Sequence, residues 1–134
     1  MSGPADRLRL LFWESTARCN LSCAHCRRLD ADSGAAGELG TDAARSLIDS
    51  AARLGRPVFV FSGGEPLLRD DWPELAAHAR SVGLPTGLAS NGTLIDAALA
   101  GRIADAGFHR VAVSLDAADA AGHDSLRGST GAFA

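Results

Sequence analysis

The stretch Cys19-Asn20-Leu21-Ser22-Cys23-Ala24-His25-Cys26 contains all three cysteines of the chain, at the spacing C-x3-C-x2-C. Three thiolates this close in sequence can converge on one soft metal centre, and a single loop can wrap around it. A [4Fe–4S] cluster has four irons, so three cysteine ligands leave one iron open to a further ligand. The stretch therefore predicts a reactive iron–sulfur cluster rather than a saturated electron carrier.

Two other interpretations of the cysteines remain open. A structural zinc site needs four ligands, but there is no fourth cysteine, and the ring of His25 is badly placed to complete the same tetrahedron. A redox pair of Cys23 and Cys26 would be expected to open a helix, and it leaves Cys19 without a role. The ligand count favours the cluster.

The composition limits the possible partners and compartments. The chain has 134 residues, enough for one domain or a piece of a larger one. Its net charge is −3, and its basic residues, all arginine, form no tract, which gives no reason to expect nucleic-acid binding. The odd cysteine count, the polar residues 1–9 and the lack of a membrane-length apolar run argue against a secreted or membrane-spanning protein. These features predict a reducing cytoplasm.

Strand and helix signals alternate along the chain. Apolar runs predict strands, and helical periodicity with capping residues (Thr41, Asp70 or Asp71, Asp96 and Gly107) predicts helices. The predicted strands are 8–13, 58–61, 85–89 and 111–115, and the predicted helices are 41–54, 72–82 and 96–106. This alternation predicts an α/β fold with parallel strands. The tail from Asp116 shows no regular period, so no helix is expected after the fourth strand. Four strands cannot close a barrel, so the chain is either part of a longer protein or a small open-sheet domain.

Each predicted strand ends in an unusual polar or glycine-rich segment. In parallel α/β folds, ligands gather at the carboxyl ends of the strands. The cysteine loop, from about Glu14 to Arg28, follows the first strand, and three further segments end the other strands: 62–66, 90–92 and 114–116. Together they predict one binding rim.

The individual segments also have simpler explanations. Gly63 and Gly64 allow backbone to approach a ligand, but a glycine pair also suits an ordinary strand-to-helix turn. Asn91 can bind a ribose or carboxylate, or form an Asx turn. Ser114 ends a strand on the same rim, and Asp116 either joins that rim or caps the next segment.

The remaining histidines and nearby charges carry weaker signals. His78 and His109 are expected to have no chemical role. His123 and Arg127 belong either to a carboxylate-binding site or to a solvated loop, since an arginine can bind a carboxylate in bidentate fashion. Arg27 and Arg28 flank the cysteine loop, where their charge would offset that of the thiolates.

The combination of these motifs resembles the radical S-adenosylmethionine (radical SAM) superfamily. The resemblance rests on Cys19-x3-Cys23-x2-Cys26 after a first strand and on Gly63-Gly64-Glu65-Pro66 after a second, with Ser90-Asn91-Gly92 and Val113-Ser114-Leu115-Asp116 following in order. It covers residues 8–134. Within the superfamily, the segments 12–16, 19–21, 25–27, 123–128 and 131–133 are similar to haem b and haem d1 biosynthesis proteins, and SPASM-type peptide maturases share most of them.

The resemblance implies a fold, a chemistry and a set of site residues. The fold is a partial (βα)6 TIM-like barrel, in which a [4Fe–4S] cluster reductively cleaves S-adenosylmethionine to a 5′-deoxyadenosyl radical that abstracts hydrogen from a small-molecule or peptide substrate. A low-potential donor of the flavodoxin or ferredoxin type supplies the electron. The implied metal ligands are Cys19, Cys23 and Cys26, and the implied cofactor-binding residues are Gly63, Gly64, Glu65, Asn91, Ser114, Arg127 and His25.

The sequence departs from the family in its extent. It carries four of the six expected strands, so residues 1–134 are expected to be the N-terminal portion of a radical SAM core domain. Substrate contacts would then lie in the remaining part. The alternative function is a non-catalytic zinc or iron–sulfur module with a structural or sensing role. The glycine motif favours the enzyme, because a structural site would not need it.

Overall fold

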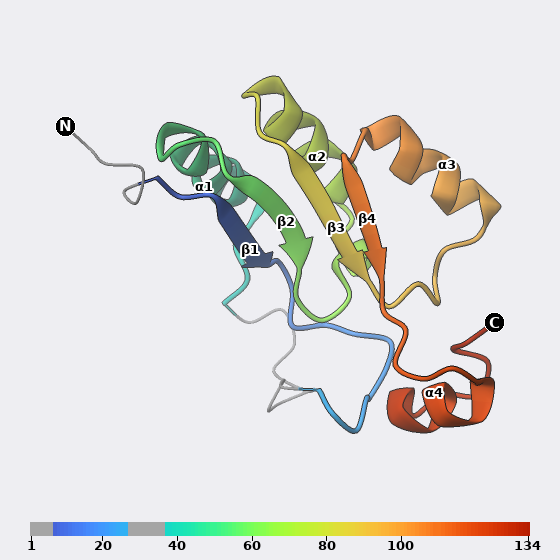
Figure 1. Ribbon diagram of the computed structural model, residues 1–134. Coiled ribbons are helices and arrows are strands. Elements are labelled where there is room, and N and C mark those ends of the chain that lie inside the picture. The colour runs from blue at the N-terminus through green and yellow to red at the C-terminus, as the bar shows by residue number, and fades with distance from the viewer. Residues whose placement is uncertain (1–6, 27–36) are drawn as a thin grey trace.

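A single parallel sheet organises the chain (Figure 1). The computed structural model describes residues 7–26 and 37–134. Its four strands lie in the order β1-β2-β3-β4, and each neighbouring pair is parallel. The strands are β1 (Leu10–Glu14), β2 (Val58–Ser62), β3 (Thr86–Ser90) and β4 (Arg110–Val113). The parallel α/β architecture predicted from the sequence is therefore confirmed.

Helices connect consecutive strands, as parallel pairing requires. The connecting helices are α1 (Thr41–Arg53), the short 3-10 helix η2 (Pro66–Leu68), α2 (Trp72–Ser81) and α3 (Ala97–Ala106), and α4 (Ala120–Arg127) follows β4. The helices α1, α2 and α3 follow one another along the sheet, while α4 lies apart from them, below the carboxyl ends of the strands in the view of Figure 1.

The core lies between the sheet and these three helices. Trp13 and Phe61 are paired in the β1–β2 register, and with Phe59 they point towards Ile48 and Leu75 on the helices. The Trp13 and Phe61 ring centroids lie 5.6 Å apart, edge to face. Such pairs contribute about 0.5–1.5 kcal/mol beyond their burial. This packing holds the carboxyl ends of β1 and β2, and the segments predicted to form the site follow directly after them.

The structure corrects two sequence predictions about helix ends. A helix does follow the fourth strand: the Asp119 carboxylate accepts from Gly122 N at its start, and Gly128 ends it in the left-handed region. The second correction concerns Thr41, which is the first residue of α1 rather than its cap, since Gly40 occupies the cap position. The Thr41 hydroxyl instead donates to Asp71 Oδ2, 2.8 Å away.

The opposite side of the sheet and the outer edge of β4 are largely uncovered. Leu10 and Phe12 on β1 are 50% and 59% exposed, and Val111 and Val113 on β4 are 46% and 56% exposed. Among the described residues, no helix is both long and apolar enough to cross a membrane.

Candidate functional site

The cysteine loop and the glycine turn after β2 form one backbone unit. Beyond the ends of β1 and β2 the hydrogen-bonded pairing continues through Gly64 N to Thr16 O at 2.7 Å and Glu65 N to Arg18 O at 2.8 Å. Segments far apart in the sequence thus run side by side up to the first cysteine. The loop enters the site in a fixed register with the glycine turn.

This close pairing explains the two glycines. A Cβ atom on Gly64 would lie 2.1 Å from Arg18 O, and one on Gly63 would lie 2.5 Å from Thr16 O. Gly63 also has φ of +129°, a conformation that side chains rarely adopt. The sequence interpretation ascribed the glycines to the approach of a ligand, whereas in the structure they first permit the approach of the cysteine loop.

A cavity of about 250 Å³ opens at the carboxyl ends of the strands, as expected for a parallel α/β fold. All predicted site residues except Glu65 line it. The lining residues are Cys19, Cys23, His25, Cys26, Ser62, Gly63, Gly64, Ala89, Ser90, Asn91, Ser114 and Arg127.

Two of the thiols have a polar donor directed at the sulfur. Asn91 Nδ2 lies 3.8 Å from Cys19 Sγ, and Arg127 Nη1 lies 3.5 Å from Cys23 Sγ. Such hydrogen-bond donors stabilise the negative charge of a thiolate that is shielded from water. Hydrogen bonds to the sulfur ligands of iron–sulfur clusters also tune the reduction potential of the cluster. In the part of the chain that the structure describes, no three His, Cys, Asp or Glu side chains already converge at metal-ligand distance. The soft donors, their hydrogen-bond partners and the shared cavity fit an iron–sulfur cluster.

Arg127 is the centre of a charged cluster beside Cys23. Its Nε lies 2.5 Å from Asp116 Oδ2, and the same carboxylate oxygen lies 3.4 Å from His25 Nε2. Burial by itself would lower the pKa of Arg127, but the hydrogen bonds and charges of Asp116 and Cys23 outweigh it and raise that pKa above its ordinary value. The guanidinium is therefore a permanent positive charge next to a metal-ligand candidate.

His123 and Arg127 do not belong to a solvated loop. His123 is 1% exposed, and its Nδ1 accepts a hydrogen bond from Asp116 N at 3.1 Å. The helix that carries both residues also contacts the cysteine loop, since Ala24 N donates to Leu126 O at 2.8 Å. This helix, which sequence analysis missed, forms one wall of the site. The residues that cap this helix, Asp119 and Gly128, are the sequence signals that could have predicted it.

Glu65 lies behind the glycine turn, against the end of β3. Its carboxylate is fully buried, accepts from Ser90 Oγ at 2.9 Å and Asn91 N at 2.8 Å, and does not line the cavity. Desolvation raises the pKa of Glu65 even though the hydrogen bonds from Asn91, Ser90 and Leu67 oppose it. In this structure Glu65 joins the glycine turn to the end of β3.

The end of β3 is tied in turn to the first cysteine. Asn91 Nδ2 donates to Asn20 Oδ1 at 2.9 Å, and Asn20 Nδ2 donates to Thr93 Oγ1 at 2.8 Å. The Asn91 side-chain oxygen accepts from both Thr93 N and Thr93 Oγ1. The expected Asx turn is present, and it also fixes the residue next to Cys19.

The other candidates lie away from the cavity. His78 Nε2 lies 2.8 Å from Asp49 Oδ1, and His109 Nδ1 accepts from Thr86 N at 3.1 Å, so both rings have partners elsewhere in the fold. Arg27 and Arg28 lie outside the described residues.

Three cysteine thiols, a glycine turn and polar strand ends line one cavity at the carboxyl ends of the parallel strands. Residues 13–133 match the Radical SAM superfamily. Because the match covers most of the chain, the protein belongs to this superfamily of enzymes. Membership implies a [4Fe–4S] cluster and S-adenosylmethionine as cofactors.

Curated relatives and a solved structure agree with this assignment. An AdoMet-dependent heme synthase of Methanosarcina barkeri is 47% identical over 93% of the chain and 36% of its own length. A pre-heme d1 synthase of Dinoroseobacter shibae is 40% identical, covering 92% of the chain and 30% of its own length. A PqqA peptide cyclase of Xanthomonas euvesicatoria pv. vesicatoria is also 40% identical, covering 86% and 31%.

The structure described as native anSMEcpe with bound AdoMet superimposes with a TM-score of 0.71 at 28% identity, over 90% of this chain and 35% of that one. The chain spans about a third of the length of the relatives it matches. The predicted resemblance to the haem-pathway and peptide-maturase branch is confirmed.

Proposed function

We propose that the chain is the cofactor-binding part of a radical SAM enzyme that modifies a tetrapyrrole. One observation supports this most directly: the three thiols, the glycine turn, Asn91 and Arg127 line one cavity at the carboxyl rim. When bound, the cluster supplies one-electron reductive cleavage of S-adenosylmethionine to a 5′-deoxyadenosyl radical. The tetrapyrrole class is favoured because the heme synthase relative is more similar than the peptide cyclase. A peptide substrate is the second candidate.

In this proposal the chain's own residues hold and orient the two cofactors. Cys19, Cys23 and Cys26 ligate three irons. Arg127 retains donors that can bind the carboxylate of S-adenosylmethionine, since a guanidinium has five N–H groups and Asp116 and Cys23 engage only two of its nitrogens.

The other lining residues complete the proposed cofactor pocket. The turn at Gly63 and Gly64 offers backbone groups to the methionine amino group, and Ser114 and Asn91 offer polar atoms from neighbouring strand ends. His25 packs beside the adenine. Glu65 contributes by fixing the glycine turn and Asn91 rather than by direct contact.

We further propose that residues 1–134 form the N-terminal portion of a larger core domain. The relatives are about three times as long, and the exposed apolar Val111 and Val113 suit a strand that would pair with the outer edge of β4. Further strands would then enclose the cavity, and water exclusion would protect the radical. A low-potential flavodoxin or ferredoxin would donate the electron in the cytoplasm.

Anaerobic reconstitution with iron and sulfide, followed by electron paramagnetic resonance, tests the proposed function. The reduced cluster should give a signal that changes when S-adenosylmethionine is added. A signal indifferent to S-adenosylmethionine would overturn the enzymatic role, and tight zinc uptake without a cluster would favour the structural metal module.

A cysteine variant tests the assignment of the three thiolates as cluster ligands. Cys23→Ala should abolish cluster binding, because two thiolates cannot hold the cluster in place of three. Full iron content in this variant would show that the ligand assignment is wrong.

A further inference from the structure

The chain upstream and downstream of the three cysteines is joined by Glu38. Its Oε1 accepts a hydrogen bond from the Thr16 hydroxyl and another from Ala17 N at 3.2 Å. The Thr16 hydroxyl also accepts from Arg18 N at 3.0 Å, so one carboxylate orders three consecutive residues at the entrance of the cysteine loop. Residues 16–18 are the same ones that pair with the glycine turn.

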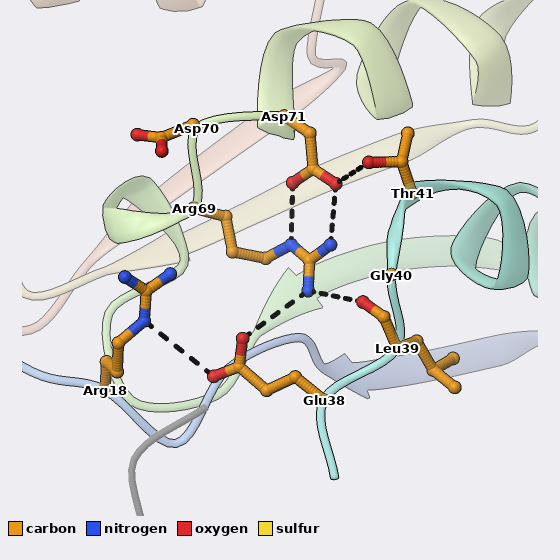
Figure 2. A pocket seen from close by; sticks show the side chains of 8 residues that line it. All are labelled: Arg18, Glu38, Leu39, Gly40, Thr41, Arg69, Asp70 and Asp71. Atoms are coloured by element: carbon orange, nitrogen blue, oxygen red, sulfur yellow. Dashed lines mark hydrogen bonds and ion pairs between the residues drawn. The ribbon is translucent and has the colours of Figure 1, made fainter. Parts of the chain in front are cut away.

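Arg69, just beyond η2, binds both sides of this junction, and Figure 2 shows its contacts to Glu38, Leu39 and Asp71. Its Nη1 donates to Ser15 O at 2.9 Å and to Leu39 O at 3.0 Å, and lies 3.8 Å from Glu38 Oε2. Its other two nitrogens form a fork on Asp71, at 2.8 and 2.7 Å.

The surroundings of Arg69 hold it in one place. The residue is 6% exposed, and its guanidinium carbon lies 5.1 Å from the centre of the Trp13 ring. A buried guanidinium with paired donors is strongly held, because each unpaired donor would remain desolvated. Asp71 therefore serves Arg69 and Thr41 instead of capping α2 with its side chain.

These contacts have a geometric consequence for the cysteines. They fix residues 15–18, which lead directly into Cys19. An approach that is already ordered loses less entropy when the thiols close on a metal centre.

We propose that Glu38 and Arg69 are positioning residues that hold the base of the cysteine loop for iron loading. The role in iron loading rests on the proposed function, whereas the contacts of Glu38 and Arg69 do not depend on it. Neither residue touches the cluster in this proposal; both act through Thr16, Ala17 and the backbone of Ser15.

Amide hydrogen exchange in the metal-free protein tests the contacts, and iron uptake from ferrous iron and sulfide tests their purpose. Glu38→Ala should accelerate exchange of the Ala17 amide about tenfold and lower the iron bound per chain. Glu38→Gln keeps a side-chain oxygen, so it should restore most of the protection and the iron. Exchange in the core of α2 should not change in either variant, which separates local loosening from a general loss of stability.

The exposed Arg45–Glu74 pair provides a matched control, since its N–O distance is 2.6 Å and it joins α1 to α2. Glu74→Ala removes the same charge and should alter neither measurement. Unchanged Ala17 exchange in Glu38→Ala would refute the contacts, and faster exchange with normal iron uptake would refute the role in loading. If the wild-type protein took up no cluster while Glu38→Ala still accelerated exchange, the proposed function would fail and the contacts would stand.

Discussion

Replacing Gly64 with alanine tests the claim that the glycine turn serves the cysteine loop. The new Cβ would lie 2.1 Å from the carbonyl oxygen and 2.7 Å from the carbonyl carbon of Arg18. Both are backbone atoms in a paired segment, so they cannot rotate away as a flexible side chain would. The turn and the loop must separate, which breaks the bonds from Gly64 N to Thr16 O and from Glu65 N to Arg18 O.

The size of the effect follows from these losses. Each backbone hydrogen bond contributes a net ~0.5–1.5 kcal/mol, and overpacking adds about 1–3 kcal/mol. With two such bonds lost, we expect Gly64→Ala to lower the free energy of unfolding by about 2–6 kcal/mol. For a chain of this size that corresponds to a drop in Tm on the order of 10 °C. Iron binding should fall as well, because the loop no longer enters in register.

Gly101→Ala is the matched control. Gly101 lies in α3, and a Cβ there would meet no atom within 4 Å. Alanine is a better helix former, so this variant should gain about 0.5–1 kcal/mol. Thermal and urea unfolding of the metal-free protein measure both changes. A Gly64→Ala protein within about 0.5 kcal/mol of the wild type would refute the claimed contact, since that is the range of neutral surface substitutions.

Two further predictions concern the carboxylates of Glu65 and Asp71. Glu65→Gln should cost roughly 1–3 kcal/mol, because an amide cannot accept at both positions where Ser90 and Asn91 donate. The folded-state pKa of Glu65 is raised above 4.5, so the wild type should lose stability as pH rises through that pKa, whereas the glutamine variant should not. Urea unfolding at several pH values measures this difference, and parallel stability profiles for the two proteins would contradict it. Asp71 has its pKa lowered below 3.8: burial alone would raise it, but the bonds from Arg69 and Thr41 outweigh that effect. The stabilising contribution of Asp71 should be present above pH 3.8 and disappear as pH falls through the lowered pKa. Asp71→Asn should therefore reduce the loss of stability at low pH in a plot of unfolding free energy against pH. An unchanged loss at low pH would rule out the contribution.

Three features of the structure could not be read from local sequence patterns. The helix α4 is only eight residues long and has one large apolar residue, Leu126, and it is held by contacts to the cysteine loop. Glu65 belongs to the glycine motif that the resemblance associates with cofactor binding, and its carboxylate accepts a hydrogen bond from Ser90 at the end of β3. Arg69 was not singled out, because nothing in its neighbours predicts a buried arginine.

The sequence by itself predicted the chemistry and determined the order of the four strands and the helices between them. Cysteine spacing, apolar runs and capping residues are local features, so the cluster motif and the alternating strands and helices could be found without the fold. The parallel order then placed the strand ends on one rim.

Only the tertiary structure decided which polar groups meet. Arg127 beside Cys23, Asn91 beside Cys19 and Glu38 beneath Thr16 are pairs separated by 104, 72 and 22 residues. Such contacts depend on how the helices pack against the sheet, which no local pattern encodes. The cysteines, Asn91 and Arg127 were therefore identifiable from the sequence, whereas their pairing with one another and the part played by Glu38 required the structure.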